Sequence, residues 1–287
     1  MKPLPFWLRM FVRVAGTVAP GAIAGLAYRM FWHLGTPLPV RERAREIHER
    51  ARVEPVRLGT RQGLVYSWGD GDELVLLVHG WRGRGAQFAD LVHSLESSSR
   101  TVVAFDAPGN GSAPGDRTDI FDYLALIRHV VEKYGQPSLM IAHSFGALAA
   151  FTAVRQGVRP ERLVSIAGVG SFDYVVDAFV GALALPRRAA AGLRRRIENG
   201  LFGGKSLRGF VSELDPTDTG IPLLVIHDRG DRAVDFGQST LIAEAHTGSV
   251  TELHTEGLGH TRILSDPTVL AAIEAFSGVA TPRRSGQ

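Results

Sequence analysis

The chain has 287 residues, and 45% of them are hydrophobic, which is enough for one large domain or two smaller ones. It contains no cysteine, so disulfides, thiolate metal sites and cysteine nucleophiles are excluded, and the composition fits a reducing compartment such as the cytoplasm. The net charge of +3 is too small to indicate nucleic acid as a partner.

The start of the chain is apolar and interrupted by arginines. Its charge-free run, residues 14–28, is too short to span a membrane. A signal peptide is an alternative, because Lys2, Arg9 and Arg13 precede the run, but glycines and Pro20 dilute it. We favour a helix that begins at Pro20 and carries on one face Ile23, Leu26, Ala27, Met30 and Leu34. That face either packs on the rest of the chain or lies on a membrane surface.

Strand and helix patterns alternate through most of the remaining sequence. A charged helix is expected over residues 41–52, followed by a hairpin of residues 56–58 and 64–66. Further strands are expected at residues 74–78, 101–105, 139–141, 163–167, 223–226 and 250–254, and helices at residues 87–97, 119–134, 145–154, 236–245 and 267–276. Repeated units of this kind predict an α/β fold with a mostly parallel sheet and helices on both faces. Ligands of such sheets bind beyond the carboxyl ends of the strands.

The alternation stops at residues 171–214, which have helical apolar spacing and a cluster of arginines. We therefore predict a small helical cap inserted after strand 163–167. The predicted organisation is an N-terminal helical extension (1–52), a core (53–168 and 221–280), the cap (169–220) and a disordered tail (281–287).

Ser144 lies where a strand pattern gives way to a helix pattern, in the pentapeptide Ala142-His143-Ser144-Phe145-Gly146. A small-x-Ser-x-small sequence at such a junction is what a nucleophile elbow requires, because a sharp turn then projects the serine hydroxyl above the sheet. A serine in an ordinary turn between strand and helix is the alternative.

A serine nucleophile needs a base and a group that orients the base. His260 follows the last predicted strand and is the candidate base. The candidate acids follow strand 223–226 and are Asp228, Asp231 and Asp235. The order along the chain is serine, acid and histidine, each in a loop at the end of a strand.

These motifs together resemble the α/β-hydrolases of the esterase, haloperoxidase and lipase kind. The resemblance covers residues 56–276 and rests on His79-Gly80-Trp81, the loop 106–112, the elbow and the loops of Asp231 and His260. The family usually has glycine where this chain has Ala142. The resemblance implies that Ser144 is the nucleophile, His260 the general base and Asp231 the orienting acid.

The backbone N–H groups of Trp81 and Phe145 are the expected oxyanion hole. His79 is expected to organise that loop beside Gly80, and His143 to form a structural hydrogen bond or a pocket wall. The glycine-rich loop 106–111 lacks the lysine of a P-loop and the spacing of a dinucleotide site.

The predicted cap has one apolar helical face, which either lines an acyl pocket or packs the cap on the core. Its residues are Phe172, Val175, Val176, Phe179 and Leu183.

The sequence thus predicts a serine hydrolase of carboxylic esters or thioesters of a small or lipid-like apolar substrate, acting through an acyl-enzyme without metal or cofactor. The same triad also supports perhydrolysis, C–C cleavage or amide cleavage, and a catalytically idle binding protein on a hydrolase fold is the third alternative. The arginine-flanked start, residues 6–34, suits a cytoplasmic protein that docks peripherally on membranes.

Overall fold

The structure is a computed structural model that describes residues 4–37, 39–204, 206–212 and 220–278. It divides into two compact units, which are described separately. The helical unit comprises residues 1–33 and 171–211, and the sheet unit comprises residues 34–170 and 212–287. The helical unit therefore joins most of the predicted cap with most of the predicted N-terminal extension.

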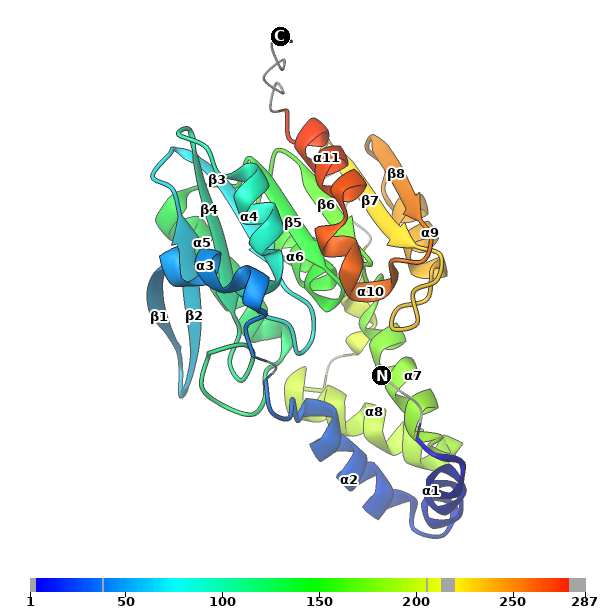
Figure 1. The fold of residues 1–287 in the computed structure, drawn as a ribbon. Helices are drawn as coiled ribbons and strands as arrows, with labels where there is room; N and C mark the ends of the chain where they lie inside the picture. The colour runs from blue at the N-terminus through cyan, green and yellow to red at the C-terminus, as the bar shows by residue number, and fades with distance from the viewer. Residues whose placement is uncertain (1–3, 38, 205, 213–219, 279–287) are drawn as a thin grey trace. The chain divides into compact units, whose positions relative to one another are not determined.

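The sheet unit is built on one eight-stranded sheet (Figure 1). Its strands are β1 (Arg52–Leu58), β2 (Arg61–Trp68), β3 (Glu73–Val78), β4 (Arg100–Asp106), β5 (Leu139–His143), β6 (Leu163–Ile166), β7 (Leu223–Asp228) and β8 (Val250–Thr255). The spatial order is β1-β2-β4-β3-β5-β6-β7-β8. β2 pairs antiparallel with β1 and β4, and all other pairs are parallel. The predicted mostly parallel sheet is confirmed.

Helices cover both faces of this sheet. They are α3 (Glu42–Arg50), α4 (Ala89–Leu95), α5 (Ile120–Tyr134), α6 (Phe145–Arg155), α9 (Gly237–Ala245), α10 (Gly259–Arg262) and α11 (Pro267–Phe276), with short 3₁₀ turns η1 (Gly85–Phe88) and η4 (Ile263–Ser265). α4 and α11 pack together on one face, and α5 and α6 pack together on the other (Figure 1). The central strands are buried on both faces, which explains their continuous apolar runs.

The predicted elements of the sheet unit are confirmed, with ends that differ by a few residues. The clearest start signal is at α5, where the Asp119 side chain accepts hydrogen bonds from the backbone N–H groups of Phe121 and Asp122. The Asp122 carboxylate in turn accepts from the Asp119 N–H, which completes a capping box. Because β3 and β5 to β8 run parallel, their carboxyl ends meet at one edge of the sheet.

The helical unit consists of α1 (Phe6–Val18), α2 (Pro20–Trp32), α7 (Phe172–Leu183), α8 (Arg187–Leu201) and the turn η2 (Leu207–Gly209). α2 packs on α8, and α1 contacts both. Small residues allow the close approach: a Cβ added to Gly192 would lie 2.9 Å from the Ala24 Cβ. None of the described helices is long and apolar enough to cross a membrane.

The helix predicted to begin at Pro20 is confirmed, but only part of its predicted face is buried. Leu26 and Met30 are exposed, and Leu34 lies beyond the end of α2. The buried face of α2 contains Ala27, which was predicted, together with Ala24 and Phe31. The reason is that α2 meets α8 through small side chains, which place the backbones too close together for leucine or methionine.

Candidate active site

Ser144 occupies the turn between β5 and α6, and the residue is 8% exposed. Its backbone has φ 57° and ψ −125°, a conformation that residues other than glycine rarely adopt. This strained turn lifts the serine from the end of a buried strand to the edge of the sheet. The predicted strand-to-helix context of the elbow is confirmed.

Two glycines make room for this turn. A Cβ on Gly146 would lie 2.5 Å from the carbonyl oxygens of Val78 and His79, and a Cβ on Gly80 would lie 2.7 Å from the Ser144 Cβ. Neither position can hold a larger residue without moving backbone or the serine itself. The two glycines therefore fix the end of β3 directly against the start of α6.

His260 connects the serine to an aspartate. Its Nε2 atom lies 3.1 Å from Ser144 Oγ, and its Nδ1 atom lies 2.7 Å from Asp231 Oδ2. Because an ionised carboxylate only accepts, Nδ1 carries the proton, and the free Nε2 accepts from the serine hydroxyl. His260 stands at the start of α10, and Asp231 stands in the loop after β7.

The Asp231 side chain is fully buried and well supplied with donors. It accepts from the backbone N–H groups of Ala233 (2.7 Å) and Val234 (3.1 Å), and His227 Nε2 lies 3.5 Å away. Burial by itself raises the pKa of Asp231, but the hydrogen bonds from His227, His260 and the backbone outweigh it and hold the pKa well below its usual range. Asp231 therefore stays ionised and can stabilise a protonated His260.

The sheet, the elbow and this hydrogen-bonded chain of three residues can be compared with known proteins. A family model described as the Alpha/beta hydrolase family matches residues 75–219, half of the chain. The chain belongs to the alpha/beta hydrolase family. The match includes Ser144 and ends before the loops of Asp231 and His260, which are supplied by the C-terminal part of this hydrolase.

Solved structures share the fold at low sequence identity. An esterase, RhEst1 from Rhodococcus sp. ECU1013, is 16% identical with a TM-score of 0.55, covering 80% of this hydrolase and 99% of that chain. A bromoperoxidase from Bacillus anthracis is 14% identical with a TM-score of 0.58, and the match covers 79% of this hydrolase and 99% of the bromoperoxidase chain. A bacterial membrane phospholipase A is 16% identical with a TM-score of 0.59, covering 92% and 93%. A search of curated proteins found no significant match.

The loop after β3 is held by His79, as predicted. Its Nε2 atom accepts from the backbone N–H of Ala107 (3.1 Å), so Nδ1 carries the proton and donates to the Gly80 carbonyl (2.7 Å). The buried Tyr123 hydroxyl also donates to the Gly80 carbonyl (3.1 Å). Burial lowers the pKa of His79, so the ring stays neutral in this hydrolase.

The same loop carries Trp81, which was predicted with Phe145 as the source of the oxyanion hole. Phe145 is the first residue of α6, directly after Ser144. The rings of Trp81 and Phe145 pack edge to face at 5.3 Å between centroids. The assignment of their backbone N–H groups to an oxyanion stays a prediction.

His143 packs against the proposed base and does not reach the serine hydroxyl as a second base. Its Nε2–H donates to the His260 carbonyl (2.9 Å), and its Nδ1 accepts from the Gln87 side chain (3.3 Å). The two imidazole rings are 4.6 Å apart. Burial, and next the nearby His260, lower the pKa of His143 to about 3. The predicted structural hydrogen bond is confirmed.

The other two candidate acids have different partners. Asp228 is buried and accepts from the Thr255 hydroxyl (2.8 Å) and from the backbone N–H groups of Leu258 (2.9 Å) and Gly230 (2.9 Å). It therefore ties the end of β7 to the loop that leads to His260. Asp235 accepts from the Gly237 N–H at the start of α9.

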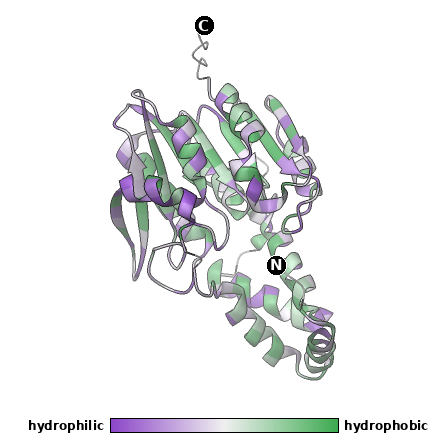
Figure 2. Cartoon of the chain, viewed as in Figure 1, coloured by the Kyte–Doolittle hydropathy of each residue, from purple (hydrophilic) through white to green (hydrophobic). Residues whose placement is uncertain are grey.

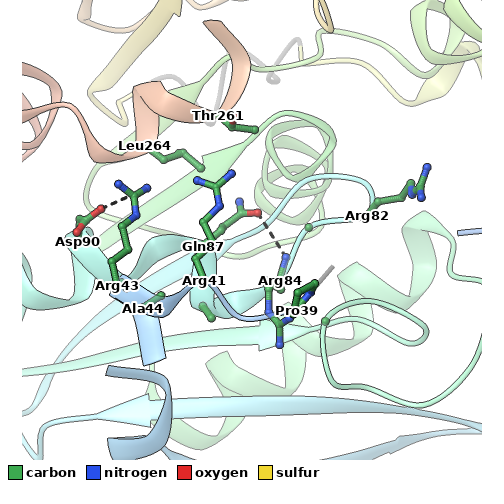
Figure 3. A pocket seen from close by; sticks show the side chains of 14 residues that line it. Pro39, Arg41, Arg43, Ala44, Arg82, Arg84, Gln87, Asp90, Thr261 and Leu264 are labelled. Carbon is green, nitrogen blue, oxygen red and sulfur yellow. Dashed lines mark hydrogen bonds and ion pairs between the residues drawn. The ribbon is translucent and has the colours of Figure 1, made fainter. Parts of the chain in front are cut away.

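A cavity of about 140 Å³ lies near His143 and His260 (Figure 3). Gln87, which contacts His143, lines this cavity, and so does Thr261, which follows His260 in the chain. Four arginines also line it, at positions 41, 43, 82 and 84. Asp90 lies 3.9 Å from Arg43. In Figure 3, Arg41 and Arg43 extend on the same side as Gln87, whereas Arg82 points away. The excess of positive charge favours an anionic group in this cavity.

Three predicted pocket residues belong to the helical unit. Phe172 and Val176 are buried, and Phe172 and Phe179 contact the Phe31 ring at 6.2 and 5.0 Å between centroids. A second ring contact joins Phe172 to Phe202 at 5.3 Å. These contacts account for the apolar face of α7 by packing within the helical unit, and a role in substrate binding stays a prediction.

Sequence reasoning assigned no role to two residues that support the site, although one of them, Asp106, begins the loop 106–112 that carries part of the family resemblance. Asp106 is buried and accepts from the backbone N–H of Gly85 (2.6 Å), the Tyr66 hydroxyl (2.9 Å) and the Ser112 N–H (2.7 Å). Gln87 also lies apart from the elbow in sequence, and no local pattern links it to His143. Among the residues that the structure describes, no group of three or more His, Asp or Glu is arranged to hold a metal ion.

Proposed function

We propose that this protein is a serine hydrolase that cleaves carboxylic ester or thioester bonds of a small or lipid-like apolar substrate through an acyl-enzyme. The observation that carries the proposal is the unbroken chain of hydrogen bonds from Asp231 through His260 to Ser144, with Ser144 held in a strained turn. This arrangement is the one in which a serine hydroxyl becomes a nucleophile at neutral pH.

In the first step, Ser144 Oγ attacks the carbonyl carbon while His260 Nε2 takes the hydroxyl proton. The buried, ionised Asp231 stabilises the imidazolium that forms. The oxyanion of the tetrahedral intermediate accepts hydrogen bonds from the backbone N–H groups of Phe145 and Trp81. The C–O or C–S bond then breaks, and the leaving group receives the proton from His260.

In the second step, water attacks the acyl-enzyme. His260 takes a proton from the water, and the acyl carbon–Oγ bond breaks as Ser144 recovers a proton. His143 keeps the base in place during both steps, because its neutral ring holds the His260 carbonyl and packs against the imidazole. The products are a carboxylic acid and an alcohol or thiol.

The choice of ester chemistry draws on two kinds of support. The family is one of hydrolases, and an esterase and a membrane phospholipase A are among the proteins that share its fold. The cavity next to His143 and His260 has apolar lining residues, Ala44, Ala86, Ala89 and Leu264, beside its four arginines, so it suits a substrate with a small apolar part and an anionic group.

Covalent labelling tests the proposal. A fluorophosphonate reacts with a serine only when a base activates it, so intact-mass measurement should show one adduct, and peptide mapping should place it on Ser144. Labelled protein should also lose hydrolysis of a panel of p-nitrophenyl esters and acyl thioesters. Folded protein that takes up no label, or that is labelled at another serine, would contradict the proposal.

A further inference from the structure

The outer face of α1 is an apolar stripe that also contains Thr17. Its exposed side chains, with the exposed fraction of each, are Phe6 (80%), Trp7 (70%), Met10 (45%), Phe11 (64%), Val14 (60%) and Val18 (80%). At about 100° per residue, these six positions fall within an arc of about 140°. Figure 2 shows hydrophobic residues along much of this helix. Isolated exposed apolar residues are normal, but a contiguous patch with three aromatic rings marks a contact surface.

This stripe is not the face by which α1 packs. The opposite side of the helix contains Gly16, which is buried, and a Cβ added there would lie 2.7 Å from the Pro186 ring at the start of α8. At the same spacing, Arg13 lies about 20° and Arg9 about 60° outside one edge of the apolar arc, so basic residues lie along one side of it. Helices with an exposed apolar face and basic residues beside it are able to bind at the interface of a membrane.

Charge is distributed unevenly between the two units. The helical unit contains eleven Lys and Arg and three Asp and Glu, a net charge of +8. The sheet unit contains 21 Lys and Arg and 26 Asp and Glu, a net charge of −5. The two units together give the +3 of the whole chain. The unit that exposes the apolar stripe is therefore also the one that is attracted to an anionic surface.

Part of this charge is concentrated at a cavity within the helical unit. The cavity has a volume of about 280 Å³ and lies between the first residues of α2 and one side of α8. Arg188 and Arg195 line it together with Pro20 and Gly21. In the described part of the chain, no carboxylate lies within ion-pair distance of these two arginines, whereas Arg194 pairs with Asp173 and Asp177. Two arginines at one cavity favour an anionic group such as a phosphate.

We infer that the helical unit docks on anionic phospholipid membranes. The α1 stripe enters the boundary between headgroups and acyl chains, and the Arg188–Arg195 cavity takes the phosphate of a headgroup. Apolar insertion and basic attraction reinforce each other, because each alone gives only weak and reversible membrane binding. The inference concerns binding and does not depend on the proposed hydrolysis.

Co-sedimentation with vesicles tests the inference on the full-length protein. The protein should sediment with vesicles of phosphatidylcholine and phosphatidylglycerol and much less with phosphatidylcholine alone. Binding should weaken at about 0.5 M NaCl, where charges are screened within a few ångströms. Inorganic phosphate at millimolar concentration should not displace the protein, since it supplies no apolar phase. Displacement by phosphate, or absence of binding to the anionic vesicles, would overturn the inference.

Two pairs of variants separate the two contributions. Trp7→Asp with Phe11→Asp should lower the partition coefficient by at least about ten-fold, because two inserted rings are replaced by carboxylates. Leu241→Asp is the matched control, since Leu241 is 55% exposed but lies in the sheet unit. Arg188→Gln with Arg195→Gln should reduce binding to anionic vesicles, whereas Arg57→Gln with Arg128→Gln in the sheet unit should not.

Circular dichroism and hydrolysis of a soluble ester should be unchanged in these variants, so a loss of membrane binding is not a loss of fold. Vesicle binding by Trp7→Asp with Phe11→Asp at the wild-type level would refute the docking surface. A dimer that ignores vesicles and dissociates in that variant would show instead that a second copy covers the stripe.

Discussion

Replacing His143 tests whether the histidine behind the proposed base is held neutral. His143 is 4% exposed, and its pKa of about 3 in the folded protein compares with 6.5 for an ordinary histidine. Between these values the unfolded chain binds a proton that the folded chain does not, so stability is fully present above pH 6.5 and falls as the pH falls. From about pH 7 to about pH 5, this side chain alone removes about 2 kcal/mol from the free energy of unfolding.

His143→Gln should lack this part of the pH dependence, because glutamine can still donate to the His260 carbonyl but does not titrate. Urea unfolding of both proteins at the two pH values measures the difference directly. His93→Gln, at an exposed position, controls for the loss of a histidine. The other groups near His143, which are His260, Asp231 and His79, are the same in both proteins. Parallel pH dependence of wild type and His143→Gln would refute the reasoning.

Three further substitutions or substrates test other parts of the site. Asp231→Asn should lower kcat by about 10⁴-fold, because asparagine favours the wrong tautomer of His260. Asp228→Asn should mainly lower the free energy of unfolding, by about 1–3 kcal/mol. Equal losses of kcat in the two variants would contradict the assignment of Asp231 as the acid. Gly146→Ala should lower the free energy of unfolding by about 2 kcal/mol or more, because the added methyl group would meet two backbone carbonyls. Gly181→Ala in α7 should raise it slightly, because a Cβ there would meet nothing within 4 Å. Equal free energies of unfolding in urea for the two variants would contradict this prediction. An ester whose leaving group bears a carboxylate, 4-acetoxybenzoate, should have a kcat/KM about five-fold higher than its neutral analogue, phenyl acetate. Arg41→Ala should abolish this gain, and Arg57→Ala should not. The same ratio of the two kcat/KM values in wild type and Arg41→Ala would exclude a role for the arginine cavity.

The parts of the fold that could be predicted are those fixed by local patterns. The continuous apolar run of β3 and the Asp119 cap of α5 are readable in sequence because burial and capping leave their mark on neighbouring residues. Ser144 and His260 could be singled out because each follows a strand, and parallel strands bring their ends together. The same rule left Asp228, Asp231 and Asp235 as candidate acids, and only the family resemblance favoured Asp231.

Contacts between distant segments left no such mark. The buried face of α2 was predicted only in part, because hydrophobicity ranks leucine and methionine above alanine, while the packing of Ala24 against Gly192 of α8 requires small residues. The pairing of Gln87 with His143 joins residues 56 positions apart, and although His143 belongs to the elbow, Gln87 belongs to no recognisable motif. The union of residues 1–33 with residues 171–211 in one unit likewise depends on tertiary packing alone.

The most direct test of the proposed function is the hydrolysis of p-nitrophenyl butyrate by Ser144→Ala beside the wild type. Ser144→Ala should lower kcat by at least about 10⁴-fold, because the nucleophile is removed while the fold and the Asp231–His260 pair remain. Circular dichroism and urea unfolding should show an intact fold in the variant. Hydrolysis at the wild-type rate by folded Ser144→Ala would contradict the proposal that Ser144 is the nucleophile.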